Sequence, residues 1–146
     1  APVRAGTLRL PMSMEIQRRE REGITILDLK GRLAVGESCT MLRESIHEQI
    51  ALGNKQIILN LQHIDYIDST GLGSMVICYT TLQKTGGSMK LENLNRRNLE
   101  LMLLTKLSTI FQIFPDEQEA VNAFFPEREI KHFDILSFVQ KQKEAE

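Results

Sequence analysis

Three oxygen-bearing side chains stand at the start of a segment with helical periodicity, those of Asp68, Ser69 and Thr70, and Gly71 and Gly73 follow them. Oxygens at this place accept hydrogen bonds from the free N–H groups of the first helical turn, so Asp68 or Ser69 can act as the N-cap. An exposed hydroxyl there can also carry a phosphate, which the helix dipole and the backbone N–H groups stabilise. Such a phosphate adds about two negative charges to any protein surface that docks there. The pattern therefore fits a simple cap or a phosphate-controlled recognition surface.

Other patterns for catalysis or ligand binding are not found in the sequence. The three histidines are scattered along the chain without the spacing of a metal site. Gly71 and Gly73 lack the third glycine of a dinucleotide-binding loop. A hydrolytic triad of His63, Asp68 and Ser69 would require neighbours in one short loop to reach the nucleophile–base–orienter geometry, which they seldom do. We therefore expect neither a metal nor a cofactor.

The composition is that of a globular protein, with 42% hydrophobic and 25% charged residues, and 146 residues suffice for one domain. A net charge of −1 lacks the basic excess that nucleic-acid binding demands. The apolar runs are shorter than the ~18–20 residues of a membrane span, and the first residues lack the apolar core of a signal peptide. Cys39 and Cys78 form no CxxC pair and are expected to be free thiols. We expect a soluble, cytoplasmic protein that contacts neither nucleic acid nor a membrane.

Alternating and helical periodicities divide the chain into strands and helices. The expected elements are strands at 13–19 and 24–30 around a Glu22-Gly23 turn, a helix capped by Ser38 and ending at 52–54, a central parallel strand at 56–61, a helix at 69–85 ended by Gly86-Gly87, a strand at 89–94, a helix at 98–104, a strand at 110–114 and a helix at 116–125. Strands separated by helix-length segments require right-handed crossovers. The fold class is therefore α/β, with a mixed, mainly parallel β-sheet that helices cover.

Two extensions flank this domain, which we place at residues 12–126. Residues 1–11 mix Pro, Arg and Gly without a period, so we expect a poorly ordered segment, with Met12 or Met14 as a natural start. Residues 127–146 carry apolar side chains every three residues and predict a C-terminal helical extension: Ile130, Phe133, Leu136 and Val139. This extension would pack on the sheet or mediate self-association, for example in a homodimer.

Two motifs of this sequence resemble the STAS domain of bacterial anti-sigma factor antagonists. They are Asp68-Ser69-Thr70-Gly71-Leu72-Gly73 after a buried strand, and Leu29-Lys30-Gly31-Arg32-Leu33 at the end of the hairpin. The resemblance extends over residues 12–125 and includes the Gly86-Gly87 break, Thr105-Lys106-Leu107 and Phe114-Pro115-Asp116-Glu117. It implies a mixed sheet with a leading hairpin and with helices packed mostly on one face.

The resemblance also implies a function. Ser69, directly after the aspartate, would be the phosphorylated residue, with Thr70 the weaker candidate. The unphosphorylated protein would bind an anti-sigma factor, often a serine kinase of the GHKL ATPase type, and so free the sigma factor for transcription. Phosphorylation would end the binding, and a PP2C-type phosphatase would restore it. The chain would thus be a substrate and a binding module, not an enzyme.

The partner-binding surface implied by the resemblance combines two segments. Asp68 would shape the electrostatics of Ser69, and Gly71 and Gly73 would give the partner access to the backbone. The full set is Asp68, Thr70, Gly71, Leu72 and Gly73 from the motif, with Gly36, Glu37 and Ser38 from the loop after the hairpin.

One position departs from the family pattern. Ala34 stands where many members carry an acidic residue in the loop that faces the serine. Glu37 is either a shifted replacement for that charge or a first-turn helix residue that the helix dipole favours. Two other functions stay open: a constitutive STAS scaffold in a stress-signalling or transport assembly, and a small-molecule or nucleotide binder that uses the helix N-terminus as an anion site.

Overall fold

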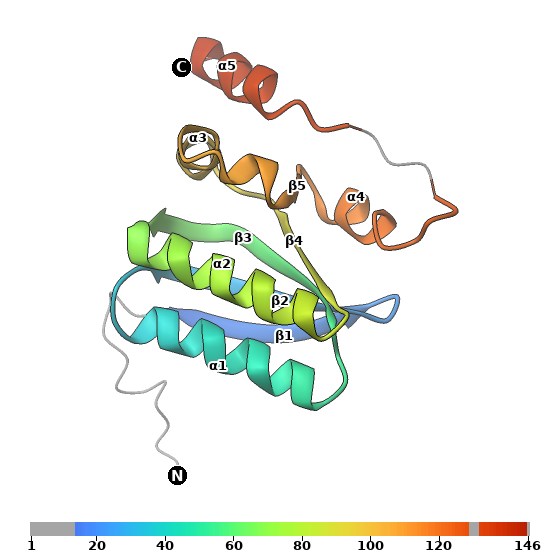
Figure 1. Cartoon of the computed structure of the whole chain (residues 1–146). Helices are drawn as coiled ribbons and strands as arrows, with labels where there is room; N and C mark the ends of the chain where they lie inside the picture. The colour runs from blue at the N-terminus through green and yellow to red at the C-terminus, as the bar shows by residue number, and fades with distance from the viewer. Residues whose placement is uncertain (1–13, 129–131, 146) are drawn as a thin grey trace.

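A five-stranded sheet forms the centre of the structure, a computed structural model that describes residues 14–128 and 132–145 (Figure 1). The strands are β1 (Glu15–Arg21), β2 (Ile24–Leu33), β3 (Gln56–Ile67), β4 (Ser88–Glu92) and β5 (Gln112–Phe114). The helices are α1 (Glu37–Ala51), α2 (Ser69–Lys84), α3 (Arg96–Leu104), a short 3-10 turn η2 (Leu107–Thr109), α4 (Glu117–Asn122) and α5 (Ile135–Ala145). The predicted order of strands and helices is confirmed, while the expectation for residues 1–11 lies outside the described residues.

The strands lie in the order β1-β2-β3-β4-β5, with β1 antiparallel to β2 and all other neighbours parallel. Glu22 and Gly23 connect the antiparallel pair with φ angles of 54° and 84°. Both values lie in the left-handed region that a tight hairpin turn requires. The mixed, mainly parallel sheet with a leading hairpin and a central β3 is therefore as predicted.

The central strand β3 is longer than the predicted 56–61. Its second half pairs with the end of β2, where Leu33 lies opposite Ile67, after irregularities in the register. In this half only Ile64 and Ile67 are buried, and the residues between them are exposed. Because the apolar run stops at Leu61, the sequence did not reveal that the strand continues to the edge where the serine motif begins.

Helices cover the sheet unequally. α1 and α2 lie over one face, and their apolar sides meet the strands in the main core, to which α3 contributes Leu99 and Met102 (Figure 1). On the opposite face α4 packs through a smaller cluster made of Ile24, Ile26, Ile58, Phe114, Ala120 and Val121. The prediction that the helices pack mostly on one face is confirmed.

The predicted capping role of Ser38 is wrong. α1 begins at Glu37 after Gly36, whose φ of 113° belongs to a region that non-glycine residues rarely adopt, and no side chain caps this helix. Ser38 is buried, and its Oγ accepts from Ala34 N and donates to Ala34 O, both at 2.9 Å. The hydroxyl therefore closes the loop in front of the helix instead of capping it.

Other boundaries differ from the predicted ones by a few residues. Asn95 caps α3 by accepting from Asn98 N, and Asp116 caps α4 by accepting from Glu119 N. α4 ends at Asn122 and not at 125, and the last strand spans only 112–114. These changes leave the predicted topology intact.

Both cysteines are free, as predicted, and both are buried. Burial raises the pKa of the Cys78 thiol to about 12, so little of the reactive thiolate forms near neutral pH. Within residues 14–128 and 132–145, no helix combines the length and apolar character that crossing a membrane requires.

The C-terminal helix packs on α3 and not on the sheet. α5 starts at Ile135 and not at 127; Phe133 precedes it, and Ile130 lies outside the described residues. Its Val139 is buried in the main core, and Lys143 Nζ lies 2.6 Å from Glu100 Oε2 of α3.

Deleting residues 127–146 should lower the melting temperature by several degrees. The deletion exposes the apolar surface under Val139, and a loss of about 1 kcal/mol shifts a domain of this size by about 2–5 °C. Differential scanning calorimetry of the full chain and the truncated chain measures this shift. As a matched pair, Val139→Ser should reproduce part of the loss and Leu136→Ser, at a position 55% exposed, should not. An unchanged melting temperature after truncation would contradict packing of α5.

Candidate functional site

Ser69 is the first residue of α2 and lies where the central strand β3 ends. Its side chain and that of Thr70 are exposed, and no hydrogen bond joins the Ser69 hydroxyl to any residue that the structure describes. The serine hydroxyl therefore stands at a helix N-terminus, where backbone N–H groups and the helix dipole favour negative charge.

Asp68 is the N-cap of α2 and ties the helix to the loop between β2 and α1. One carboxylate oxygen, Oδ1, accepts from Gly71 N at 2.7 Å, and the other, Oδ2, accepts from Val35 N at 2.9 Å. Desolvation opposes ionisation of this carboxyl, but the backbone N–H groups of Val35 and Gly71 prevail and lower its pKa below the ordinary value. At neutral pH, Asp68 therefore places a negative charge next to Ser69 in the chain.

The two glycines of the motif have different environments. Gly71 is buried, and a Cβ added to it would collide with the carbonyl oxygen of Leu33 at the end of β2. Gly73 is exposed, and a Cβ added to it would meet nothing within 4 Å. Gly71 thus permits the close approach of α2 to β2, whereas the fold offers no reason for Gly73. Leu72, between them, is buried in the main core.

The loop after β2 brings only part of the predicted surface to Ser69. Gly36 and Glu37 are exposed and follow Val35, whose N–H is bound by Asp68, so they lie beside the start of α2. Ser38 faces inward. The site is therefore a surface formed by the 35–37 loop and the exposed side of α2, with Gly71, Leu72 and Ser38 beneath it.

Three exposed apolar side chains near this end of the sheet or along α2 were not predicted. Val35 is 73% exposed, Ile77 52% and Tyr66 40%, and the guanidinium carbon of Arg32 lies 5.7 Å from the centre of the Tyr66 ring. A signal for Ile77 was available, because it falls outside the apolar stripe that faces the core from α2. Exposed apolar groups of this kind commonly contribute to protein interfaces.

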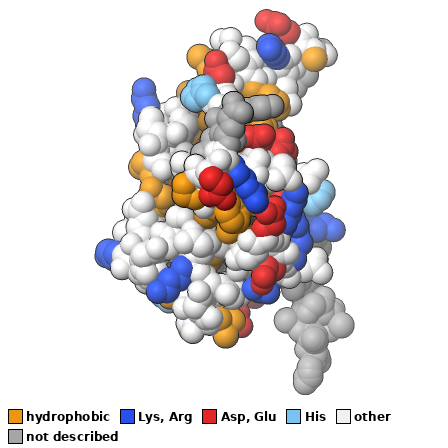
Figure 2. All heavy atoms as spheres, turned by 90° about the vertical axis from the view of Figure 1, so that its right-hand side faces the viewer, with side chains coloured by type: hydrophobic (Ala, Val, Ile, Leu, Met, Phe, Trp, Pro, Cys, Tyr) orange, Lys and Arg blue, Asp and Glu red, His pale blue; other side chains and the backbone are white. Residues whose placement is uncertain are grey.

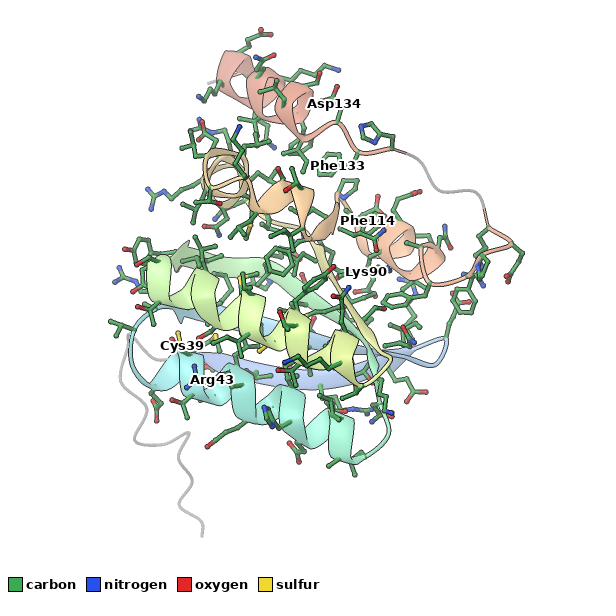
Figure 3. The ribbon with its side chains drawn as sticks, viewed as in Figure 1. Cys39, Arg43, Lys90, Phe114, Phe133 and Asp134 are labelled. Carbon is green, nitrogen blue, oxygen red and sulfur yellow. The ribbon has the colours of Figure 1, made fainter. Side chains whose placement is uncertain are left out.

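Helices α1 and α2 are also joined to each other behind this surface. Arg43 of α1 donates from Nη1 to Ser74 Oγ of α2 at 3.0 Å, and Figure 3 shows Arg43 on the α1 side of this junction, one turn from Cys39. This bond fixes α1 against α2 and so supports the relative position of the loop and the Ser69 turn.

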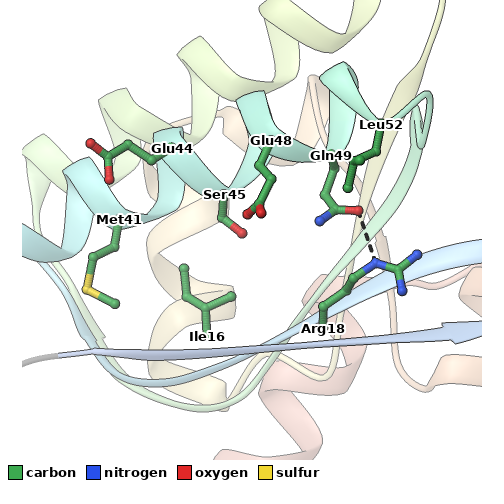
Figure 4. Close-up of a pocket in the computed structure, with 8 residues that line it drawn as sticks. All are labelled: Ile16, Arg18, Met41, Glu44, Ser45, Glu48, Gln49 and Leu52. Atoms are coloured by element: carbon green, nitrogen blue, oxygen red, sulfur yellow. Dashed lines mark hydrogen bonds between the residues drawn. The ribbon is translucent and has the colours of Figure 1, made fainter. Parts of the chain in front are cut away.

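Two grooves of the described part of the molecule lie away from Ser69. One of about 470 Å³ runs between β1 and α1 and is lined by Ile16, Met41 and Leu52 with charged side chains at its rim (Figure 4). Another of about 310 Å³ lies beside β5. Ser69 lines neither groove, and no group of His, Cys, Asp and Glu within the described ranges is arranged to hold a metal ion. Ser69 therefore lies on an exposed surface and outside both of these grooves.

Comparisons with known proteins identify the family. Residues 15–120 match the STAS domain. The chain is 32% identical over 102 residues to the anti-sigma-B factor antagonist of Bacillus subtilis (strain 168), covering 70% of this chain and 92% of that one. Solved structures with the same fold include a putative anti-sigma factor antagonist from Thermotoga maritima, at 23% identity and a TM-score of 0.69, covering 74% of this chain and 92% of that one. Another is the Bacillus cell fate determinant SpoIIAA in its phosphorylated form, at 20% identity and a TM-score of 0.59, covering 75% and 99%. The chain therefore belongs to the STAS domain family, among the anti-sigma factor antagonists.

Proposed function

We propose that this chain binds an anti-sigma factor while Ser69 carries a free hydroxyl and releases it when Ser69 is phosphorylated, which regulates sigma-dependent transcription. The partner in this proposal is an anti-sigma factor with serine kinase activity of the GHKL type, and a PP2C-type phosphatase reverses the modification. The chain itself is the substrate and the binding module, and the ATP chemistry belongs to the partner.

The observation that carries the proposal is the division of roles at the start of α2. Asp68 performs the capping, with both carboxylate oxygens bound to backbone N–H groups. Ser69 is left exposed, without a hydrogen bond to any described residue. A serine needed as a cap would be bound to the backbone, so this hydroxyl is free for modification without loss of the helix start.

Charge explains how a phosphate could act without a change of fold. The phosphate gains from the helix N-terminus, so α2 stays in place. It also concentrates negative charge beside Asp68 and the exposed Glu37, on the surface that would meet the partner. Like charges and desolvation at an interface cost several kcal/mol, and about 1.4 kcal/mol is tenfold in affinity.

Affinity capture from the native cell extract tests the proposal. Wild-type chain and the Ser69→Ala variant serve as baits, and mass spectrometry identifies the bound proteins and the fraction of Ser69 that carries phosphate. We expect both to retain an anti-sigma factor, the variant more strongly because it cannot be phosphorylated. If the two baits retain the same partners equally and Ser69 carries no phosphate, the chain is a constitutive STAS scaffold.

A further inference from the structure

A polar cluster lies between the sheet and α4, on the face opposite α1 and α2, with partly exposed arginines at its outer side and the buried Glu92 at its inner side. Its residues come from α4 and from every strand except β5. They are Arg19, Arg21, Asp28, Asn60, Glu92 and Glu117. Figure 2 views the molecule from the side of the hairpin turn and α4, where acidic and basic side chains lie next to one another.

Four of these charges balance one another. Arg19 lies 2.6 Å from Asp28 and 2.5 Å from Glu117, and Arg21 lies 3.0 Å from Glu117. Asp28 also accepts from Asn60 Nδ2 at 2.8 Å. Two guanidinium groups thus meet two carboxylates, and they fasten the first turn of α4 to the hairpin. A third carboxylate in this cluster would have no cation of its own.

Glu92, the last residue of β4, is that third carboxyl group. It is fully buried, and its Oε1 has no hydrogen-bond partner among the described residues. Its Oε2 has only Asn93 Nδ2 at 3.5 Å. An ionised carboxylate is costly to bury with so little compensation, whereas a protonated oxygen needs an acceptor and not a donor. The Glu117 carboxylate of the same cluster, held by Arg19 and Arg21, is such an acceptor.

We propose that Glu92 is a neutral carboxylic acid that donates its proton in a hydrogen bond to the Glu117 carboxylate, and that this pair is a latch between β4 and α4 that opens when Glu92 ionises. Ionisation places a third carboxylate, buried and without a cation of its own, beside the two that already share the two guanidinium groups. Repulsion between Glu92 and Glu117 then favours the separation of α4 from the sheet.

The surrounding charges agree with this assignment. Burial, and then the hydrogen bond to Glu117, raise the pKa of Glu92 to about 9, and Asp28 acts in the same direction while Arg19 opposes it. The hydrogen bond from Arg19 lowers the pKa of Glu117 to about 2. Lys90, the other charged residue of β4 on this face, donates to a side chain of β5 instead (Figure 3).

The direction of the pH effect follows from these shifts. The folded chain holds the Glu92 proton more tightly than the unfolded chain, so this stabilisation is full below about pH 4.5 and is lost as the pH rises toward 9. Glu117 acts in a separate window, because its stabilisation is present above about pH 4.5 and is lost as the pH falls toward 2. Between pH 5 and 9, the latch therefore contributes a stability that decreases with pH.

Melting temperatures from pH 5 to pH 9 for wild type and Glu92→Gln test the latch. The amide keeps the shape and donates to Glu117 without titrating, so we expect the variant to be more stable than wild type by several degrees at pH 9 and similar to it at pH 5. Glu20→Gln, at a side chain 58% exposed, is the matched control and should follow wild type at every pH. Parallel curves for wild type and Glu92→Gln would overturn the proposal.

Infrared spectroscopy gives a second readout that does not depend on the stability of the variant. Wild type at pH 7 should show the carbonyl band of a protonated carboxyl group, which disappears as the pH passes 9 and is missing from Glu92→Gln. A wild-type spectrum at pH 7 with only ionised carboxylates would refute a neutral Glu92.

Discussion

Replacing Ser69 by aspartate should weaken binding of the anti-sigma partner by about 100-fold or more, equivalent to ~2.7 kcal/mol. The new carboxylate lies beside Asp68, whose pKa is already lowered, and thus adds to the negative charge at the docking surface. The melting temperature should stay the same or rise slightly, because α2 has no acidic residue in its first turn and an acidic one there is favoured by the helix dipole. Isothermal titration calorimetry with the captured partner measures the affinity.

Two control variants show whether the effect of Ser69→Asp depends on where the negative charge is placed. Ser69→Ala should bind as wild type does, because the hydroxyl makes no hydrogen bond to a described residue. Gln83→Glu adds one negative charge near the other end of α2, about 21 Å along the helix axis, and should change the affinity little. Equal binding by Ser69→Asp and Gln83→Glu would contradict a charge switch at Ser69.

Much of the fold could be predicted from the sequence, because most elements carry a period or a breaker of their own. The Glu22-Gly23 turn set the hairpin, and Gly86-Gly87 ended α2 near the predicted residue. The second half of β3 could not be predicted in this way. Most of its side chains are exposed and polar, so it lacks the pattern of a buried strand, and pairing with β2 holds it in the sheet. α5 shows the same limit: its periodicity predicted a helix, but tertiary contacts placed it on α3.

The candidate site was predictable where a residue type has one dominant role. An aspartate followed by a serine before a helix predicted a cap at Asp68 or Ser69, and the cap is Asp68. The bond from Val35 to Asp68 could not be predicted, because it joins two loops that only the fold brings together. The inward turn of Ser38 depends on the same loop, whose backbone at Gly36 has a positive φ. Sequence reasoning therefore located the helix cap and the neighbouring hydroxyl but not the shape of the surface around them.

Gly73→Ala should make the protein more stable and its partner binding weaker. Glycine within a helix costs about 0.5–1 kcal/mol relative to alanine, and the open space above Gly73 accepts a methyl group, so we expect the melting temperature to rise by about 2–5 °C. Gly73 lies one turn from Ser69 on the exposed side of α2. We expect the partner backbone to pass close over it, and the added methyl group to reduce the affinity by about tenfold, ~1.4 kcal/mol.

Gly71→Ala, two residues earlier in the same motif, should have the opposite effect on stability. Its methyl group would meet the Leu33 carbonyl, which belongs to a paired strand and cannot move aside cheaply. Overpacking of this kind costs about 1–3 kcal/mol, so the melting temperature should fall by about 5–10 °C. Calorimetry of both variants, and titration of each with the same partner, distinguish a glycine needed for packing, Gly71, from a glycine needed for partner recognition, Gly73. If Gly73→Ala bound the partner as tightly as wild type, the exposed glycine would not be part of the recognition surface, and the surface would be limited to Ser69 and the 35–37 loop.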